Sequence, residues 1–363
     1  MDQEKIYTIA FSHIPAVGPV SFARLTAHFP TLYEAWHATR DEYVCAKISN
    51  AAIGHIASER SKIDIEAILA KLTQERINVV TAQDDVYPEL LRKIYDPPYV
   101  LYYRGTLPEK DRTLFGVIGA RKATPYGLQC THRLVPDLST HGIGIVSGLA
   151  YGIDAASHEA ALAHSGYTLA VIAGGVDHAS IYPSVHRNLA DRIIASGGCV
   201  LSEYPPATQP LPRQFPLRNR IIAGISQGVL VVEAAEKSGA LITATCALEN
   251  GREVCAVPGP ITSPFSSGTN RLIKSGAHAI TQSADILSIL GFDLSSDGIA
   301  SSAIPTLTDA ERILYDVLSR EPMHLDDLIK ESRLDTQVVA STLLMLEMKN
   351  LIRSYDRMQY SRI

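Results

Sequence analysis

Between residues 114 and 290, short apolar runs alternate with segments whose apolar residues recur at helical spacing. Each run is too short for a typical helix and has no polar face, which is typical of a parallel strand buried between two layers of helices. The runs cover residues 114–118, 143–146, 169–173, 199–201, 229–232 and 254–257. The alternation predicts an α/β fold, an extended Rossmann-like, doubly wound parallel sheet.

The two flanks of this region predict smaller domains. Residues 1–82 have helical spacing and a Gly18 turn within 14–25 that resembles a helix-hairpin-helix, so we expect a helical domain of the SAM or helix-hairpin-helix type. The glycine could equally do no more than close a turn. Residues 83–290 are expected to form the sheet domain, which a proline-rich, extended connector at 96–102 enters.

The C-terminal flank has a different composition. Residues 291–304 are rich in Ser, Asp and Gly, which indicates a linker. Residues 305–363 then predict three helices, at 308–319, 325–330 and 336–349, and a strand pair that turns at Asp356. Three helices followed by a small hairpin are typical of a winged-helix domain.

Composition narrows the cellular and chemical setting. The five cysteines are scattered without a Cys-x-x-Cys pair, which argues against a disulfide framework or a zinc ribbon and favours a reducing, cytoplasmic location. No apolar run approaches the length of a membrane span, and the N-terminus lacks a signal-peptide pattern. The twelve histidines show no metal-ligand spacing, so we expect neither a metal site nor a cofactor.

Basic residues are concentrated locally although the whole chain has a formal charge of −5. Residues 204–232 contain no Asp or Glu, and this stretch carries arginines, a candidate helix-capping asparagine and an aromatic residue on which a base could stack. These residues are Arg213, Phe215, Arg218, Asn219 and Arg220. Because planar guanidinium groups match phosphate oxygens, the stretch predicts a phosphate-binding segment.

Glycines and small hydroxyl residues follow most of the predicted strands. Since the carboxyl ends of parallel strands meet at one edge, their loops would present a row of backbone N–H groups and helix N-termini to one crevice. The loops contain Gly119 with Arg121 and Lys122, Ser147 with Gly148, Gly174 with Gly175, Ser238 with Gly239, and Pro258 with Gly259. We therefore predict an anion-binding edge.

The basic side chains divide into two groups of candidate phosphate ligands. Arg121, Arg218 and Arg220 are the principal candidates, because they lie at the predicted edge or in the acid-free stretch. Lys122, Arg213 and Lys274 are secondary candidates, because an exposed basic side chain is usually only solvated.

Three residues raise an enzymatic alternative. Asp154 and His158 are four residues apart on a predicted helix near Ser147, which superficially matches nucleophilic catalysis. Ser147 lacks a Gly-x-Ser-x-Gly context, however, so we interpret this group as structural and predict no catalytic residue. The first loop also lacks the glycines of a nicotinamide-binding turn.

Glu233 follows a predicted strand, and its role is left open. Its carboxylate could face a ribose hydroxyl, or it could hold the N–H groups of a neighbouring loop.

Taken together, the motifs of the central region resemble the DNA-processing protein A family, also called DprA or Smf. The resemblance is strong over residues 85–285 and follows layout alone in the two flanks. The matching strings are residues 87–88, 96–98, 119–121, 147–154 with His158, 174–175, 182–183, 202–205, 215–224, 232–234, 238–239, 257–259 and 268–270.

The resemblance implies a non-enzymatic protein that binds single-stranded DNA along the predicted edge. It also implies a homodimer formed through the sheet domain and recruitment of the RecA recombinase during natural transformation. By position, the family's arginine after the first glycine falls on Arg121, its Arg-Asn-Arg on 218–220, and its aromatic residue on Phe215. The Lys and Asn that often follow Tyr-Pro in the family are absent, and Arg187 is the candidate replacement.

Two other functions remain as alternatives. Similar folds in the cytokinin-activating, lysine-decarboxylase-like group hydrolyse nucleotides, and here Glu233 and Arg121 could act as base and phosphate ligand. A sensor that holds a free nucleotide is the third hypothesis. For the winged-helix tail we predict protein contacts or control of access, because its presumed recognition helix at 336–349 has a single basic residue at its end.

Overall fold

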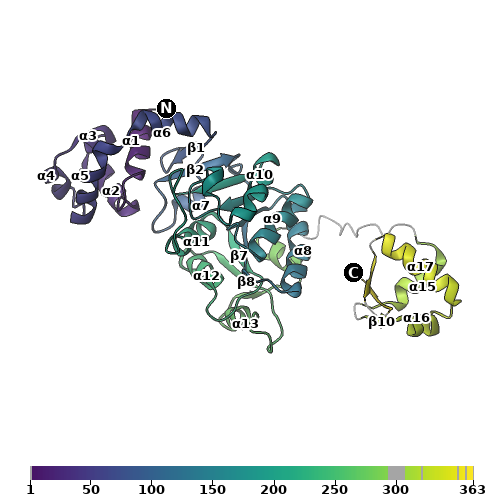
Figure 1. The fold of residues 1–363 in the computed structure, drawn as a ribbon. Coiled ribbons are helices and arrows are strands. Elements are labelled where there is room, and N and C mark those ends of the chain that lie inside the picture. Colours follow the sequence, from purple (N-terminus) through teal and green to yellow (C-terminus); the bar gives the residue numbers. More distant parts are fainter. Residues whose placement is uncertain (1, 293–306, 320–321, 350, 356–357, 363) are drawn as a thin grey trace. The chain divides into compact units, whose positions relative to one another are not determined.

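The computed structural model describes residues 2–292, 307–319, 322–349, 351–355 and 358–362. The chain divides into two compact units, residues 1–292 and 293–363 (Figure 1). From residue 293 onward, the expected linker at 291–304 lies outside the described residues, and so does the predicted turn at Asp356.

All six predicted strands form, with ends within two residues of those expected, and they run parallel at the centre of a nine-stranded sheet. They are β3 (Leu114–Ile118), β4 (Gly144–Ser147), β5 (Thr168–Val171), β6 (Cys199–Ser202), β7 (Gly228–Val231) and β8 (Glu253–Ala256). The full order is β1-β2-β6-β5-β4-β3-β7-β8-β9. This confirms the doubly wound, Rossmann-like fold.

Three further strands widen the sheet beyond the prediction. β1 (Asn78–Thr81) and β2 (Val100–Gly105) pair antiparallel, and β2 pairs antiparallel with β6, with Tyr102 opposite Ser202. The extended connector thus becomes β2, and the sheet begins inside the range that we assigned to the helical domain. At the other edge β9 (His278–Ala279) runs parallel to β8.

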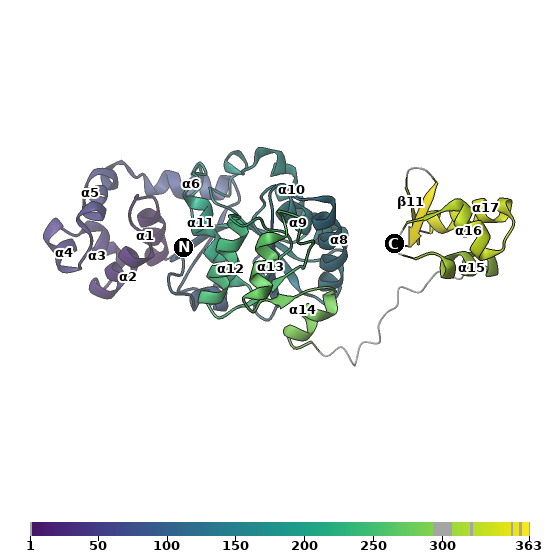
Figure 2. The ribbon, with the colours of Figure 1, turned by 90° about the horizontal axis from the view of Figure 1, so that it is seen from below.

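Helices cover both faces of the sheet, as Figures 1 and 2 show. Phe115 and Val117 of β3 pack toward one layer, whereas Leu114 and Ile118 pack toward the other, because successive strand residues point to opposite faces. The first layer contains α8 (Pro125–Thr140), α9 (Ile153–Ala163), α10 (Arg187–Ala195) and α14 (Ser283–Ile289). The second contains α7 (Glu89–Arg92), α11 (Gln214–Ile225) and α12 (Gly239–Glu249). α13 (Ser267–Lys274) follows β8.

The N-terminal helices form a small core of their own around Phe11 and Trp36, whose rings pack edge to face at 5.0 Å. Gly18 caps the second helix and Pro19 occupies its first turn, a position that proline favours. The helices are α1 (Gln3–Ser12), α2 (Pro19–His28), α3 (Leu32–His37), α4 (Arg40–Cys45), α5 (Asn50–Glu59) and α6 (Ile65–Gln74). Ile9 and Leu72 pack against sheet residues, so this module and the sheet share one compact unit.

The second unit is a winged helix, as predicted. Leu314, Leu328 and Leu343 pack together in its core, one from each helix. Its elements are α15 (Asp309–Val317), β10 (Met323–His324), α16 (Leu325–Ser332), α17 (Thr336–Met348), β11 (Ile352–Tyr355) and β12 (Gln359–Arg362). The strands pair in the order β10-β12-β11.

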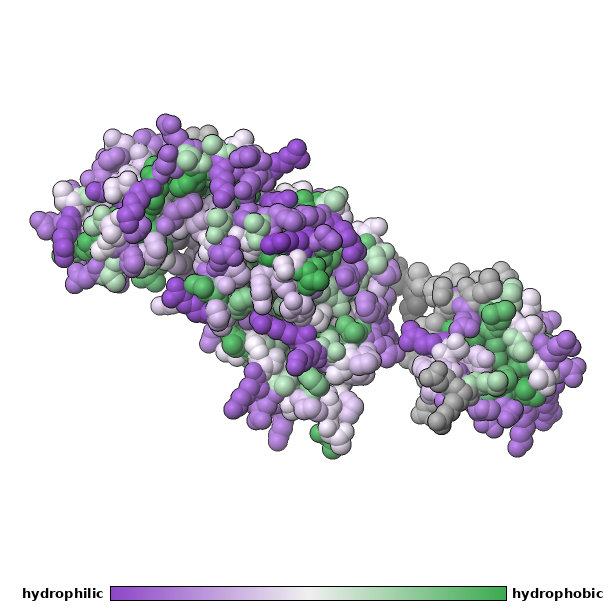
Figure 3. Space-filling view, in the orientation of Figure 1, coloured by the Kyte–Doolittle hydropathy of each residue, from purple (hydrophilic) through white to green (hydrophobic). Residues whose placement is uncertain are grey.

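The surface seen in Figure 3 is mostly hydrophilic, and its hydrophobic residues form small, separate groups. Within the described part of the chain, none of the helices combines the length and the apolarity that crossing a membrane requires.

The central strand supplies a stability test. Phe115 in β3 is 0% exposed, so Phe115→Ala should lower the free energy of unfolding by about 3–5 kcal/mol through lost burial and a cavity. Tyr95 is 97% exposed, so Tyr95→Ala is the matched control and should change this free energy by less than about 0.5 kcal/mol. Urea unfolding followed by circular dichroism measures both, and equal effects would contradict the central position of β3.

Candidate nucleic-acid interface

A pocket of about 670 Å³ opens at the carboxyl ends of β3 and β7. The two strands are neighbours, but from β3 the chain proceeds to β4, β5 and β6 on one side and reaches β7 on the other. The sheet order therefore reverses here, and the loops after β3 and β7 diverge. In open α/β sheets ligands bind at such a switch point.

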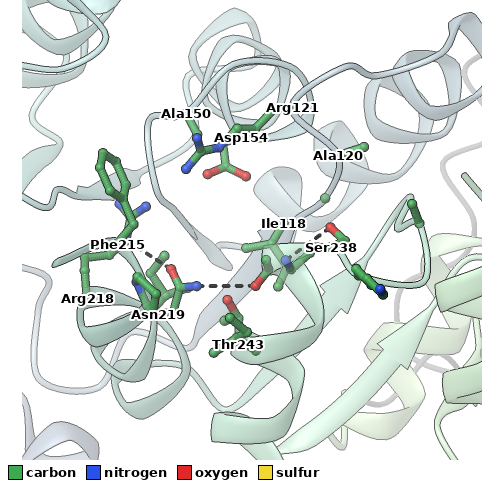
Figure 4. Close-up of a pocket in the computed structure, with 18 of the residues that line it drawn as sticks. Ile118, Ala120, Arg121, Ala150, Asp154, Phe215, Arg218, Asn219, Ser238 and Thr243 are labelled. Carbon is green, nitrogen blue, oxygen red and sulfur yellow. Dashed lines mark hydrogen bonds between the residues drawn. The ribbon is translucent and has the colours of Figure 1, made fainter. Parts of the chain in front are cut away.

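The pocket brings together residues from loops that are far apart in the sequence (Figure 4). The predicted site residues that line it are Gly119, Arg121, Lys122, Phe215, Arg218, Asn219, Ser238 and Gly239. The predicted residues outside its lining are Ser147, Gly148, Gly174, Gly175, Arg213, Arg220 and Lys274. Arg121 and Arg218 thus share one pocket, which is what a single cationic site requires.

Arg121 is the exposed arginine of this pocket. Its Cζ atom lies 5.1 Å from the centroid of the Phe215 ring, a cation–π distance. Tyr182 adds a second ring, edge-on to Phe215 with a centroid separation of 5.8 Å. A guanidinium group and two partly exposed aromatic rings therefore lie side by side at the opening.

The phosphate-binding segment folds differently from the prediction in one respect. α11 begins at Gln214, so Asn219 lies inside the helix and cannot cap it. Its side-chain oxygen instead accepts from Arg218 Nε at 3.2 Å, and its amide nitrogen donates to the carbonyl oxygen of Gly239 at 3.4 Å. Pro216 is tolerated because the first helical turn needs no internal N–H bond there.

Arg218 also lines the pocket, but it is buried, with 3% of the residue exposed. Its Nη1 donates to the carbonyl oxygen of Gly148 at 2.8 Å and also to that of Val171. Burial lowers the pKa of Arg218 to about 10, and the nearby Asp154 carboxylate opposes this shift. Burial likewise raises the pKa of Asp154, and Arg218 and Arg121 counteract that rise.

Arg220 is also turned inward, with 9% exposed. It donates to the backbone oxygen of Asp96 at 2.6 Å, lies 3.2 Å from the carboxylate of Asp96, and pairs with Glu203. The expectation that Arg218 and Arg220 offer free guanidinium groups to phosphate is therefore not what the structure shows. Both satisfy internal acceptors because α11 packs against the sheet along most of its length.

The predicted row of free N–H groups is shorter than expected. The amide of Gly148 donates to Asp154 Oδ2 at 3.2 Å and that of Gly175 to the Thr208 oxygen at 2.9 Å. Gly259 and Gly268 also use their amides internally, with Asn270 and Ala234 as acceptors. Gly174 and Gly175 are buried against residues 205–210. Several of these glycines therefore allow close packing of the chain and do not offer free N–H groups to a ligand.

The structure decides the role that was left open for Glu233. The residue is 2% exposed, and its carboxylate accepts from Thr124 N at 2.9 Å and from Thr124 Oγ1 at 2.5 Å. A Cβ atom at Gly127 would lie 2.2 Å from the same carboxylate. Glu233 therefore holds the loop after Arg121 and the start of α8, and it does not face the pocket.

The Ser147, Asp154 and His158 group is structural, as we interpreted it. Ser147 is 0% exposed and its hydroxyl donates to the carbonyl oxygen of Val117 at 2.6 Å. His158 is also 0% exposed, and its Nδ1 lies 2.7 Å from Thr168 Oγ1. Burial lowers the pKa of His158 to about 3, so the ring is neutral and unsuited to proton transfer near neutral pH.

Sequence reasoning missed Lys237 and Tyr182, which both line the pocket. Lys237 immediately precedes the predicted Ser238 and Gly239 loop, so a basic residue next to that loop was an available signal. Arg187, the candidate replacement for a basic contact after Tyr182, donates to the Ala179 oxygen at 2.7 Å and does not line the pocket. Among the described residues, no group of His, Cys, Asp and Glu could hold a metal ion.

Comparison with known proteins identifies the family of the chain. A family model described as DNA recombination-mediator protein A matches residues 78–291, and one described as the DprA winged helix domain matches residues 299–356. The chain belongs to the DNA processing protein A family. The first match begins at Asn78, where β1 begins.

Several relatives of this DprA family member are similar over much of their length. The chain is 44% identical to the DNA processing protein DprA of Bacillus subtilis over 250 residues, which is 68% of this chain and 81% of that protein. It is 34% identical to the protein Smf of Synechocystis over 99% of both chains.

Two solved DprA structures share the fold. That of Streptococcus pneumoniae matches with a TM-score of 0.66 and 34% identity over 79% of this chain and 98% of that one. The structure of the Helicobacter pylori protein, which is described for its single-stranded DNA binding mode, matches with a TM-score of 0.52 and 30% identity. The match covers 59% of this chain and 95% of that one.

The buried histidine gives a direct test of the structural interpretation. We expect the His158 ring to remain neutral from about pH 8 down to about pH 5, because its pKa is lowered to about 3. Ring proton and nitrogen chemical shifts of His158, followed by NMR as the pH is lowered, measure this. Titration of His158 near its ordinary pKa of about 6.5 would contradict burial.

Proposed function

We propose that this chain binds single-stranded DNA in the pocket at the ends of β3 and β7. The observation that carries the proposal is the exposed Arg121 guanidinium group beside the Phe215 ring, at 5.1 Å. A guanidinium group suits the phosphate of a nucleotide and a ring suits its base, and neither requires a particular base. The exposed base faces that such a ring needs are available in single strands.

The charges around the pocket support a polyanionic ligand. Arg121, Lys122 and Lys237 are exposed and line it. Among the described residues that line the pocket, Asp154 is the one acidic residue, and it is 7% exposed with a backbone amide bound to its carboxylate. Three accessible cations against one buried carboxylate give a positive local field in a chain that is acidic overall.

Family membership supports a finer assignment. We propose that the protein acts as a recombination mediator in the cytoplasm, protecting incoming single strands and loading the RecA recombinase on them during natural transformation. The family description as a recombination mediator and the DNA-binding mode of the Helicobacter pylori protein support this assignment. We further propose a homodimer formed through the sheet domain.

We propose a non-catalytic role for the pocket and protein contacts for the winged helix. The nucleotide-hydrolysing alternative needs Glu233 as a base, but both of its carboxylate oxygens bind Thr124. The basic residue that ends the α17 region, Lys349, pairs with Glu311 at 2.7 Å, and the sequence of α17 itself contains no Lys or Arg. Such a helix is poorly suited to reading a DNA groove.

DNA binding and its salt dependence test the proposal. With about three phosphates neutralised, the logarithm of the association constant should fall with the logarithm of salt concentration with a slope of about −2. Arg121→Ala should weaken binding roughly tenfold and reduce the magnitude of that slope by about 0.7, because one phosphate contact is lost. Fluorescence anisotropy of a labelled oligonucleotide at several salt concentrations measures both quantities.

The matched control is Arg133→Ala, which removes an exposed arginine on α8 outside this pocket. It should leave the affinity within about twofold of the unsubstituted protein. Equal losses in the Arg121 and Arg133 variants would show binding by diffuse charge and contradict the pocket as the site.

The enzymatic alternative has its own measurement. We expect no release of base or phosphate from nucleoside monophosphates incubated with the protein, because Glu233 is bound to Thr124 and does not line the pocket. Product formation followed by chromatography would favour hydrolysis if it disappeared in Glu233→Gln and Arg121→Ala.

A further inference from the structure

Gly148 is held through both of its peptide groups. Its N–H donates to Asp154 Oδ2 at 3.2 Å, and its carbonyl oxygen accepts from Arg218 Nη1 at 2.8 Å. The same Nη1 donates to the carbonyl oxygen of Val171, the last residue of β5. Because Gly148 directly follows β4, one buried guanidinium group joins α11 to the carboxyl ends of two neighbouring strands.

The guanidinium group of Arg218 occupies the space where a side chain at position 148 would lie. A Cβ atom there would meet Arg218 Nη2 at 2.6 Å and Cζ at 2.7 Å. A side chain at 148 would therefore displace the guanidinium group of Arg218. Arg218 Nε is also engaged internally, with Asn219 Oδ1 at 3.2 Å.

The loop that starts at Gly148 ends at Gly152 and Ile153, which contact the backbone of Ala120 and Arg121. The amide of Ile153 donates to the carbonyl oxygen of Ala120 at 3.2 Å. Gly152 has a φ of 76°, and a Cβ atom on it would lie 2.3 Å from the Ala120 oxygen and 2.7 Å from the Arg121 oxygen. The backbone of Gly152 thus packs directly on the peptide that carries Arg121, so the position of this loop sets the position of Arg121.

We infer that Arg218 is a positioning residue and not a phosphate ligand. Together with Asp154 it clamps Gly148, holds residues 148–153 in place, and through Gly152 and Ile153 fixes the backbone of Arg121. The inference rests on the proposed binding of single-stranded DNA, and it assigns the two arginines of one pocket different tasks. Arg121 is exposed and reaches a phosphate, whereas Arg218, at 3% exposed, acts through Arg121.

A contact residue and a positioning residue differ in two measurable ways. Loss of a phosphate contact removes one released counterion and changes the salt slope, whereas loss of positioning reduces the fraction of molecules competent to bind and leaves the slope unchanged. Two independent contacts also contribute additively, whereas a residue that acts through another does not add to the loss of that other.

The test is a double-mutant cycle on the full chain, with anisotropy titrations of a labelled oligothymidylate at several salt concentrations. Arg121→Gln should weaken binding roughly tenfold and reduce the magnitude of the slope by about 0.7. Arg218→Gln should weaken binding with the slope unchanged, and the double variant should bind no more weakly than the weaker single variant. A product of the two losses, or a slope reduced by about 0.7 in Arg218→Gln, would overturn the inference.

Gly148→Ala provides a second variant that keeps the charge of Arg218 but displaces its guanidinium group. It decides the question if Arg218→Gln does not fold. It should weaken binding with an unchanged slope and be non-additive with Arg121→Gln, whereas unchanged affinity would overturn the inference. The control is Gly54→Ala in α5, where a Cβ atom meets nothing within 4 Å and binding should not change.

The unsubstituted protein separates this inference from the proposed function. If it does not bind the oligonucleotide at all, the proposed function fails and the inference with it. If it binds and Arg121→Gln weakens binding while the Arg218 and Gly148 variants behave as contacts, only the positioning role is overturned.

Discussion

The reversal of strand order between β3 and β7 is the constraint on which the site depends. The chain leaves these two neighbouring strands in opposite directions, so their loops diverge at the carboxyl ends. A pocket forms between the loops as a result of the strand order. The loop after β3 delivers Arg121 and Lys122, and the loop after β7 delivers Lys237. Glu233, which follows β7, fixes the first of these loops by binding Thr124.

Burial separates the functions of three arginines that look equivalent in the sequence. A buried guanidinium group needs acceptors within the protein. Arg218 donates to two carbonyl oxygens and to Asn219, and Arg220 pairs with Asp96 and Glu203. Arg121 keeps its donors accessible. The positive charge in the pocket therefore comes from the accessible Arg121 and from the buried Arg218, whose charge Asp154 partly balances.

The sequence was a good guide to the sheet and a partial guide to the site. Residues 114–118 and the other apolar runs became strands because a strand buried on both faces must be apolar throughout. β1 and β2 were missed because 78–81 and 100–105 mix polar with apolar residues, and antiparallel strands need no continuous apolar run. Tyr182 was missed because a lone tyrosine carries no pattern, and Lys237 was missed although it precedes the Ser238 and Gly239 loop. Only the folded chain brings both into the pocket that Phe215 lines.

By itself, the sequence determined the six central strands, the winged-helix tail and the family to which the chain belongs. These depend on local patterns of apolar residues, glycines and prolines, which act on neighbouring positions whatever the rest of the chain does. The tertiary structure alone decided which glycine amides are bonded internally, which arginine reaches solvent and what Glu233 binds. Those properties depend on what packs against each group, and for Gly148 and Arg218 the partners lie 70 residues apart in the chain.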